Sequence, residues 1–208
     1  MAAAALVAAT LAGCSHAMQT ASASAVPSSS PRPSGPVQRP VNAADLHFMS
    51  GMIPHHAQAV LIAGWAPSHG ASSSVQTLCE RIVNAQRDEI VMMQNWLRDR
   101  GQPVPATDAK ALHMMMNGME HDMLMPGMLN DDELAQLDRA RGTEWERLFL
   151  QDMIKHHAGA ITMVDELLHS PGSAQDEMVF RFSTDVYADQ TTEIARMTQM
   201  LNALGGAP

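Results

Sequence analysis

After residue 41, apolar residues recur every three or four positions in four long stretches, which is the period of an amphipathic helix. The predicted helices cover about residues 42–66, 74–100, 144–169 and 173–204. Capping residues such as Asn42 precede them, and helix-stopping residues such as Pro171 and Gly172 follow them. Pro54 lies inside the first stretch and is expected to kink that helix. No alternating apolar and polar run is long enough for a strand in this pattern, which therefore predicts an all-α chain.

The four stretches form two copies of one pattern. Residues 48–59 and 149–160 share a Phe, a Met-Ile pair, the block His-His-Ala and a final Ala. Residues 86–97 and 190–201 share Gln-x-x-Glu-Ile, followed by Met and Leu. Each repeat therefore predicts a helical hairpin, and two hairpins packed together make a four-helix bundle.

Polar residues fall on the apolar faces of these helices. Glu89 and Glu193 lie within the apolar stripes of the second and fourth helices, where a carboxylate is costly unless it is paired or ligated. His56 and His157 face inward from the first and third helices, while His55 and His156 fall at the stripe edge. We predict a polar layer at mid-bundle. Its core is Met52, His56, Glu89, Met153, His157 and Glu193, with His55 and His156 as further candidate ligands and Gln86, Gln190, Met93 and Met197 beside it.

Two interpretations of this layer stay open. The His and Glu residues can form a buried polar network that fixes the register of the hairpins and binds nothing. Alternatively, imidazole and thioether groups can bind a soft transition metal, with the carboxylates orienting the imidazoles or acting as harder ligands.

A second group of candidate ligands lies between the repeats, in the Met- and His-rich stretch of residues 113–128. We expect a short helix that starts after Thr107 and breaks at Pro126-Gly127, followed by another helix with a capping box at residues 130–133. Such a segment offers an accessible loading site for Cu(I) or Ag(I), or else simply packs over the end of the bundle. The candidate ligands there are His113, Met116, Met119, His121 and Met123.

Composition supports a cation ligand. The chain has 18 Met and 10 His but only 4 Phe and 1 Tyr, and thioether and imidazole are donors that soft or borderline metals prefer. Lys and Arg number 13 against 22 acidic residues, a net charge of -9, which argues against nucleic acid as a partner.

The first 41 residues differ from the rest. Residues 2–12 are apolar but too short to span a bilayer as a mature helix, and Leu11, Ala12 and Gly13 lead directly to Cys14. This arrangement resembles a bacterial lipoprotein signal in which Cys14 is lipidated, although no Lys or Arg precedes the apolar run. Residues 15–41 are rich in Ser, Ala and Pro and are expected to form a disordered tether. The predicted organisation is a signal over 1–14, a tether over 15–41 and a bundle domain over 42–208, with a lipid anchor as the only membrane contact.

The doubled motifs resemble the bacterial family catalogued as domain of unknown function 305. The resemblance rests on Phe-x-x-x-Met-Ile-x-His-His at residues 48–56 and 149–157, on the Gln-x-x-Glu-Ile-x-x-Met motifs, and on the Met-x-Gly-Met-Leu segment at 125–129. It implies a ferritin-like four-helix bundle. It also implies an exported protein, because members are usually exported and some are associated with periplasmic copper or silver binding and resistance.

These observations favour an exported, non-enzymatic protein that sequesters Cu(I) or passes it to an envelope metal-handling protein. One alternative is a ferritin-like dinuclear iron or manganese oxidase, which needs Glu-x-x-His on two helices. Only Glu166 and His169 have that spacing. The other alternative is a metal-free interaction module. No Ser/His/Asp set and no phosphate-binding glycine loop is visible, which disfavours hydrolase and nucleotide chemistry.

Overall fold

The computed structural model describes the backbone of residues 40–107, 112–116 and 119–205, and the side chains of these residues except those from 108 to 122. The predicted signal, Cys14 and the tether up to residue 39 lie outside the described residues. Val41, at the end of the predicted tether, is partly buried and packs against the core, so the tether ends earlier than predicted. The described elements are α1 (Ala43–Ala63), α2 (Ser73–Asp99), β1 (Leu112–Met116), β2 (Met119–Met123), α3 (Asp131–Arg139), α4 (Gly142–His169) and α5 (Glu177–Gly205).

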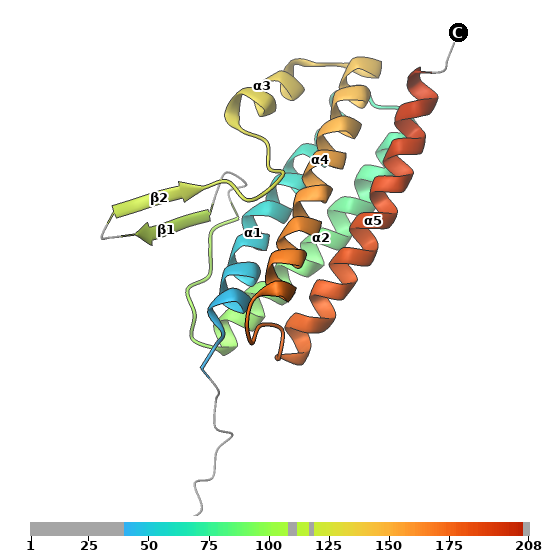
Figure 1. Ribbon diagram of the computed structural model, residues 1–208. Helices are drawn as coiled ribbons and strands as arrows, with labels where there is room; N and C mark the ends of the chain where they lie inside the picture. The colour runs from blue at the N-terminus through green and yellow to red at the C-terminus, as the bar shows by residue number, and fades with distance from the viewer. Residues whose placement is uncertain (1–39, 108–111, 117–118, 206–208) are drawn as a thin grey trace, which may run out of the picture. The chain divides into compact units, whose positions relative to one another are not determined.

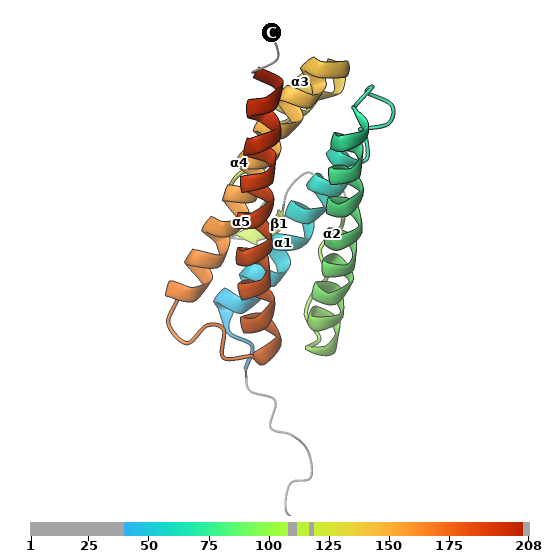
Figure 2. The ribbon, with the colours of Figure 1, turned by 90° about the vertical axis from the view of Figure 1, so that its right-hand side faces the viewer.

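The four long helices form the predicted bundle (Figures 1 and 2). Helix α1 packs against α2 in the first hairpin, and α4 packs against α5 in the second. The two hairpins meet where α1 packs against α4. None of the described helices is long and apolar enough to cross a membrane.

The helix ends follow the capping chemistry of the sequence. The Asn42 side chain accepts a hydrogen bond from the amide of Ala44 at 2.8 Å, which caps α1. The predicted capping box is present before α3, where the side chains and amides of Asn130 and Glu133 bond reciprocally. Asp176 accepts a bond from the amide of Met178 at 3.0 Å at the start of α5.

The prediction of a helix in the Met- and His-rich stretch is wrong. This part of the chain is an antiparallel hairpin in which Leu112 pairs with Met123 and Met116 with Met119 (Figure 1). The sequence carried a signal for it, because Asn-Gly at positions 117–118 is the dipeptide that most strongly favours a tight hairpin. Methionine is unbranched and packs in either conformation, so the Met spacing alone did not decide between helix and strand.

After β2, the segment 125–129 crosses α1 and α4. Gln58 of α1 holds it like a neighbouring strand, donating to the carbonyl of Leu129 at 2.9 Å and accepting from the Leu129 amide at 2.7 Å. A Cβ atom on Gly159 of α4 would lie 1.9 Å from the carbonyl oxygen of Pro126, so glycine is required at this crossing. The close approach brings the segment directly over the His-His motifs of both helices.

Candidate metal centre

The four histidines of the doubled motif, two on α1 and two on α4, are buried inside the bundle. His55 is 1% exposed, and His56, His156 and His157 are 0% exposed. The prediction that His55 and His156 lie at the stripe edge is wrong, because their rings stack with centroids 3.8 Å apart and a tilt of 38°. Helix α1 packs against both α2 and α4, so it buries a wider arc than one apolar stripe.

Each repeat contains a histidine–carboxylate pair. The Nε2 atom of His56 lies 2.7 Å from Oε2 of Glu89 on α2. The second hairpin has the same arrangement, with Nε2 of His157 2.7 Å from Oε2 of Glu193 on α5. The carboxylate side chains are 21% and 13% exposed, so each pair links a buried ring to a partly exposed carboxylate, and Glu89 lines a cavity between α2 and α5. A carboxylate oriented in this way fixes the tautomer and the direction of an imidazole.

Several ring nitrogens in this layer have no hydrogen-bond partner among the described residues. They are Nδ1 of His55, Nδ1 of His56, both nitrogens of His156, and Nδ1 of His157. His55 donates from Nε2 to the carbonyl of Pro126 at 3.1 Å, which leaves its Nδ1 lone pair free when the ring is neutral. Buried polar atoms are paired in the great majority of cases, so this concentration of unpaired nitrogens needs an explanation.

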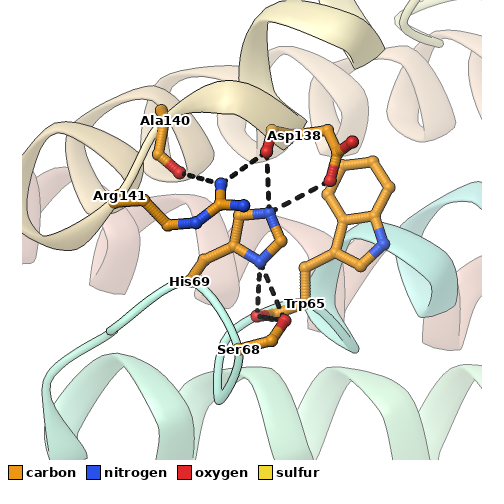
Figure 3. Close-up of polar contacts among 6 residues, drawn as sticks. All are labelled: Trp65, Ser68, His69, Asp138, Ala140 and Arg141. Atoms are coloured by element: carbon orange, nitrogen blue, oxygen red, sulfur yellow. Dashed lines mark hydrogen bonds and ion pairs between the residues drawn. The ribbon is translucent and has the colours of Figure 1, made fainter.

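His69 shows what a structural histidine looks like in the same molecule (Figure 3). It is 4% exposed, and both of its ring nitrogens are bonded. Nδ1 lies 3.0 Å from the carbonyl of Trp65, and Nε2 lies 3.0 Å from the carbonyl of Asp138 (Figure 3). His69 thereby joins the α1–α2 turn to the end of α3, whereas the rings of the doubled motif have nitrogens without a hydrogen-bond partner among the described residues.

Burial makes the stacked imidazoles neutral. Burial, reinforced by the charge of His56, lowers the pKa of His55 to about 3. Burial and the neighbouring rings of His55 and His157 hold the pKa of His156 well below 6.5. Both rings therefore carry a lone pair at neutral pH, which is the form that binds metals.

Buried thioethers and amides lie one helical turn from these His and Glu residues along their helices. Met52, Met153, Met93 and Met197 are each 0% exposed, as the apolar stripe predicts. Gln86 and Gln190 are buried as well, and the Oε1 atom of each has no hydrogen-bond partner among the described residues. Soft sulfur atoms and unpaired amide oxygens thus lie one helical turn along the chain from the buried imidazoles or their carboxylate partners.

Comparison with known proteins identifies the family. The sequence profile described as "Domain of unknown function (DUF305)" matches residues 45–201. This chain belongs to the DUF305 family. No match was found among curated proteins.

Solved structures of DUF305 proteins are similar to this chain. A DUF305 protein of Streptomyces coelicolor, described as secreted, is 28% identical with a TM-score of 0.66, and the alignment covers 78% of this chain and 94% of the other. A DUF305 fragment from Deinococcus radiodurans is 27% identical with a TM-score of 0.65, covering 79% of this chain and 99% of the other. CopM in its Cu(I)-bound form is 26% identical with a TM-score of 0.59, and the alignment covers 78% of this chain and 98% of CopM. CopM has also been solved with Cu(II) and with Ag. Metal binding is therefore established for some proteins of this fold.

The donor set of this DUF305 chain limits the kind of ion it can hold. Among the described residues, no three His, Cys, Asp or Glu side chains are placed to hold a metal ion together. Glu166 and His169, whose spacing matched the dinuclear iron and manganese enzymes, are both exposed at the end of α4. The described part of the chain therefore lacks the inward carboxylate–histidine cluster of those enzymes.

The other predicted ligands of this DUF305 chain lie in the hairpin. The side chains of His113, Met116, Met119 and His121 lie outside those that the structure describes, so the loading site remains a prediction. The helix that was predicted to carry them is wrong, because the backbone there forms strands. Met123, at the end of β2, is partly buried and packs against the core.

Proposed function

We propose that this protein binds Cu(I) or Ag(I) in the cell envelope and sequesters the ion or passes it to another envelope metal-handling protein. The observation that carries the proposal is the set of unpaired nitrogens on four buried imidazoles, next to buried methionines. His69 supports this interpretation, because a histidine that serves only structure in this molecule has both nitrogens bonded.

The bundle site uses neutral imidazole and thioether donors. Its ligands are drawn from Met52, His55, His56, Met153, His156 and His157, with Glu89 and Glu193 orienting the rings. Cu(I) and Ag(I) accept few ligands and prefer soft donors, which fits a layer without a three-carboxylate or three-histidine cluster. Iron and manganese favour harder, carboxylate-rich sites and fit the layer less well.

Loading requires one ring of the stacked pair to turn, because lone pairs lie in the ring plane. His156 is the ring that turns at least cost, since its nitrogens make no hydrogen bond of normal geometry among the described residues and only a weak contact with the His55 backbone. His55 stays anchored to the carbonyl of Pro126 and presents Nδ1. An ion in this layer would therefore be held by one anchored imidazole, His55, and one adjustable imidazole, His156.

The envelope location rests on the amino-terminal sequence. A lipid on Cys14 would anchor the protein, and residues 15–41 would tether the bundle to the membrane surface. The Met- and His-rich hairpin would then collect ions from outside and deliver them to the bundle. Globomycin-sensitive processing, or incorporation of labelled palmitate that is lost in Cys14→Ser, tests the anchor.

Competition with a chromophoric Cu(I) chelator tests the binding. The experiment uses the full chain carrying Cys14→Ser, because a free thiol would itself bind Cu(I). We expect His156→Leu to weaken binding at least tenfold, and the exposed His169→Gln to leave it unchanged. Absence of Cu(I) transfer from the chelator to the parent protein would overturn the proposal.

Stability separates this function from a purely structural network. His156→Leu removes two unpaired buried nitrogens without breaking a bond to a described residue, so the metal-free variant should be as stable as the parent or more so. The parent should gain thermal stability on adding Ag(I), and the variant should gain much less. A variant that loses more than about 2 kcal/mol without metal would indicate a structural role instead.

A further inference from the structure

A cavity of about 420 Å³ lies outside the histidine layer, between the start of α1, the end of α4 and the residues that follow β2. Met123, Met125 and Met163 line it together with His47 and Glu166. Met125 and Met163 are almost completely buried, at 3% and 4% exposed, while His47 and Glu166 are exposed at the rim. Three thioethers from two separate parts of the chain thus border one space that solvent can enter.

Two of these methionines converge over Gly51 of α1. The Sδ atom of Met125 lies 2.6 Å, and the Cε methyl of Met163 lies 3.3 Å, from the point that a Cβ of residue 51 would occupy. Because glycine has no side chain, the ends of both methionines occupy that space. The thioether groups of Met125 and Met163 are therefore within reach of one ion after a change of terminal torsion, which methionine makes easily.

The surroundings of the cavity favour a positive charge. Glu166 and Leu167 line it from the last turn of α4, where the helix dipole presents carbonyl oxygens and negative potential. Glu166 adds a carboxylate at the rim, and the chain as a whole has a net charge of -9. His47 offers an imidazole on the opposite wall, from the second turn of α1.

We infer that this cavity is a second soft-cation site, in which the thioethers of Met123, Met125 and Met163, with His47, bind Cu(I) or Ag(I). Sulfur donors with one imidazole select soft monovalent ions over Mg²⁺, Ca²⁺ or Mn²⁺, which prefer oxygen. The site lies directly outside the histidine layer, since Met125 precedes Pro126, whose carbonyl accepts the bond from His55. This inference rests on the proposed affinity for soft cations but concerns different ligands.

The test counts bound Ag(I) in the full chain carrying Cys14→Ser. Protein is loaded with Ag(I), freed of excess by gel filtration and analysed for metal and protein. The variant Met125→Leu/Met163→Leu removes two sulfurs at nearly constant volume, and Met200→Leu on α5 is the matched control. Carbon-13 labelling of methionine methyl groups provides a second measurement, with the Met163 resonance assigned by its loss in Met163→Leu.

We expect the double variant to bind one equivalent of Ag(I) fewer than the parent, and the Met200→Leu control to bind as many. In His156→Leu, whose bundle site is weakened, Ag(I) should still shift the Met163 methyl resonance. An unchanged Met163 resonance, or equal silver content in the parent and the double variant, would refute the cavity site while leaving the bundle site intact. A parent protein that binds no Ag(I) would refute both.

Discussion

Replacing Gly159 by alanine places a methyl group where the segment 125–129 now crosses α4. The added Cβ would lie 1.9 Å from the carbonyl oxygen and 2.4 Å from the carbonyl carbon of Pro126, and 2.7 Å from Cα of Gly127. All three atoms belong to the backbone, which cannot move aside as the end of a flexible side chain can. The segment must therefore lift away from α4.

The cost can be bounded from what the segment buries. Met125, Met128 and Leu129 are 3%, 5% and 1% exposed, and full release of three such side chains to water would cost roughly 5–9 kcal/mol. A partial shift costs less, about 1–3 kcal/mol for overpacking and about 1 kcal/mol for each strained hydrogen bond. This loss is offset in part, because alanine in a helix interior is more stable than glycine by about 0.5–1 kcal/mol. We expect Gly159→Ala to lower the free energy of unfolding by about 2–4 kcal/mol.

Urea unfolding followed by circular dichroism measures this loss, and amide hydrogen exchange locates it. The amide of Leu129, which donates to Gln58, should lose protection more than the amides in the centres of the helices. Gly205→Ala is the matched control, because no atom lies within 4 Å of its added Cβ, and it should be neutral or slightly stabilising. Gly51→Ala should lower the free energy of unfolding by an amount between those of Gly205→Ala and Gly159→Ala, since its Cβ meets the flexible end of Met125. Equal stability of Gly159→Ala and the parent would refute the claimed crossing.

Three further predictions concern other parts of the fold. Burial alone would raise the pKa of Asp176, but the hydrogen bonds it accepts from Arg100 and a backbone amide lower this pKa below 3.8. Its ionised form therefore stabilises the fold above that pH. We expect Asp176→Asn to lower the free energy of unfolding by about 1–2 kcal/mol at pH 7, and by less when the urea titration is run below pH 4. His69→Leu breaks the hydrogen bonds that join the α1–α2 turn to the end of α3 and should cost about 1–2 kcal/mol in the same assay, in contrast to His156→Leu. Burial raises the pKa of Cys79 to about 12. In the Cys14→Ser variant, alkylation of Cys79 by iodoacetamide at pH 8 should therefore be at least about 100-fold slower in the folded protein than in the protein unfolded by urea.

Periodicity was enough to find the bundle, because a helix buries one face and repeats its apolar residues accordingly. The pairing of His56 with Glu89, and of His157 with Glu193, also followed from the sequence. A carboxylate on an apolar face needs a partner, and the duplicated pattern placed an imidazole at a matching level in each hairpin. The capping box before α3 could also be predicted from the sequence, because its hydrogen bonds join residues that are close in sequence.

The Met spacing predicted a helix where the chain forms a hairpin, and only Asn-Gly in this stretch indicates the turn. Methionine fits both helix and strand, whereas Asn-Gly specifies a turn through backbone conformation. The stacking of His55 on His156 could not be predicted from the pattern of one helix. Their stacking depends on how closely α1 approaches α4, which a single helical wheel cannot express.

The amino-acid sequence by itself determined the repeat, the four amphipathic helices, the inward His and Glu residues and the abundance of soft donors, because these are properties of spacing and composition. Only the tertiary structure decided which donors share a space. The crossing of α1 with α4 stacked His55 on His156, and the return of the chain through Pro126 and Gly127 brought Met125 beside Met163. Contacts of this kind join residues far apart in the chain, so their geometry depends on packing between helices and not on any local period.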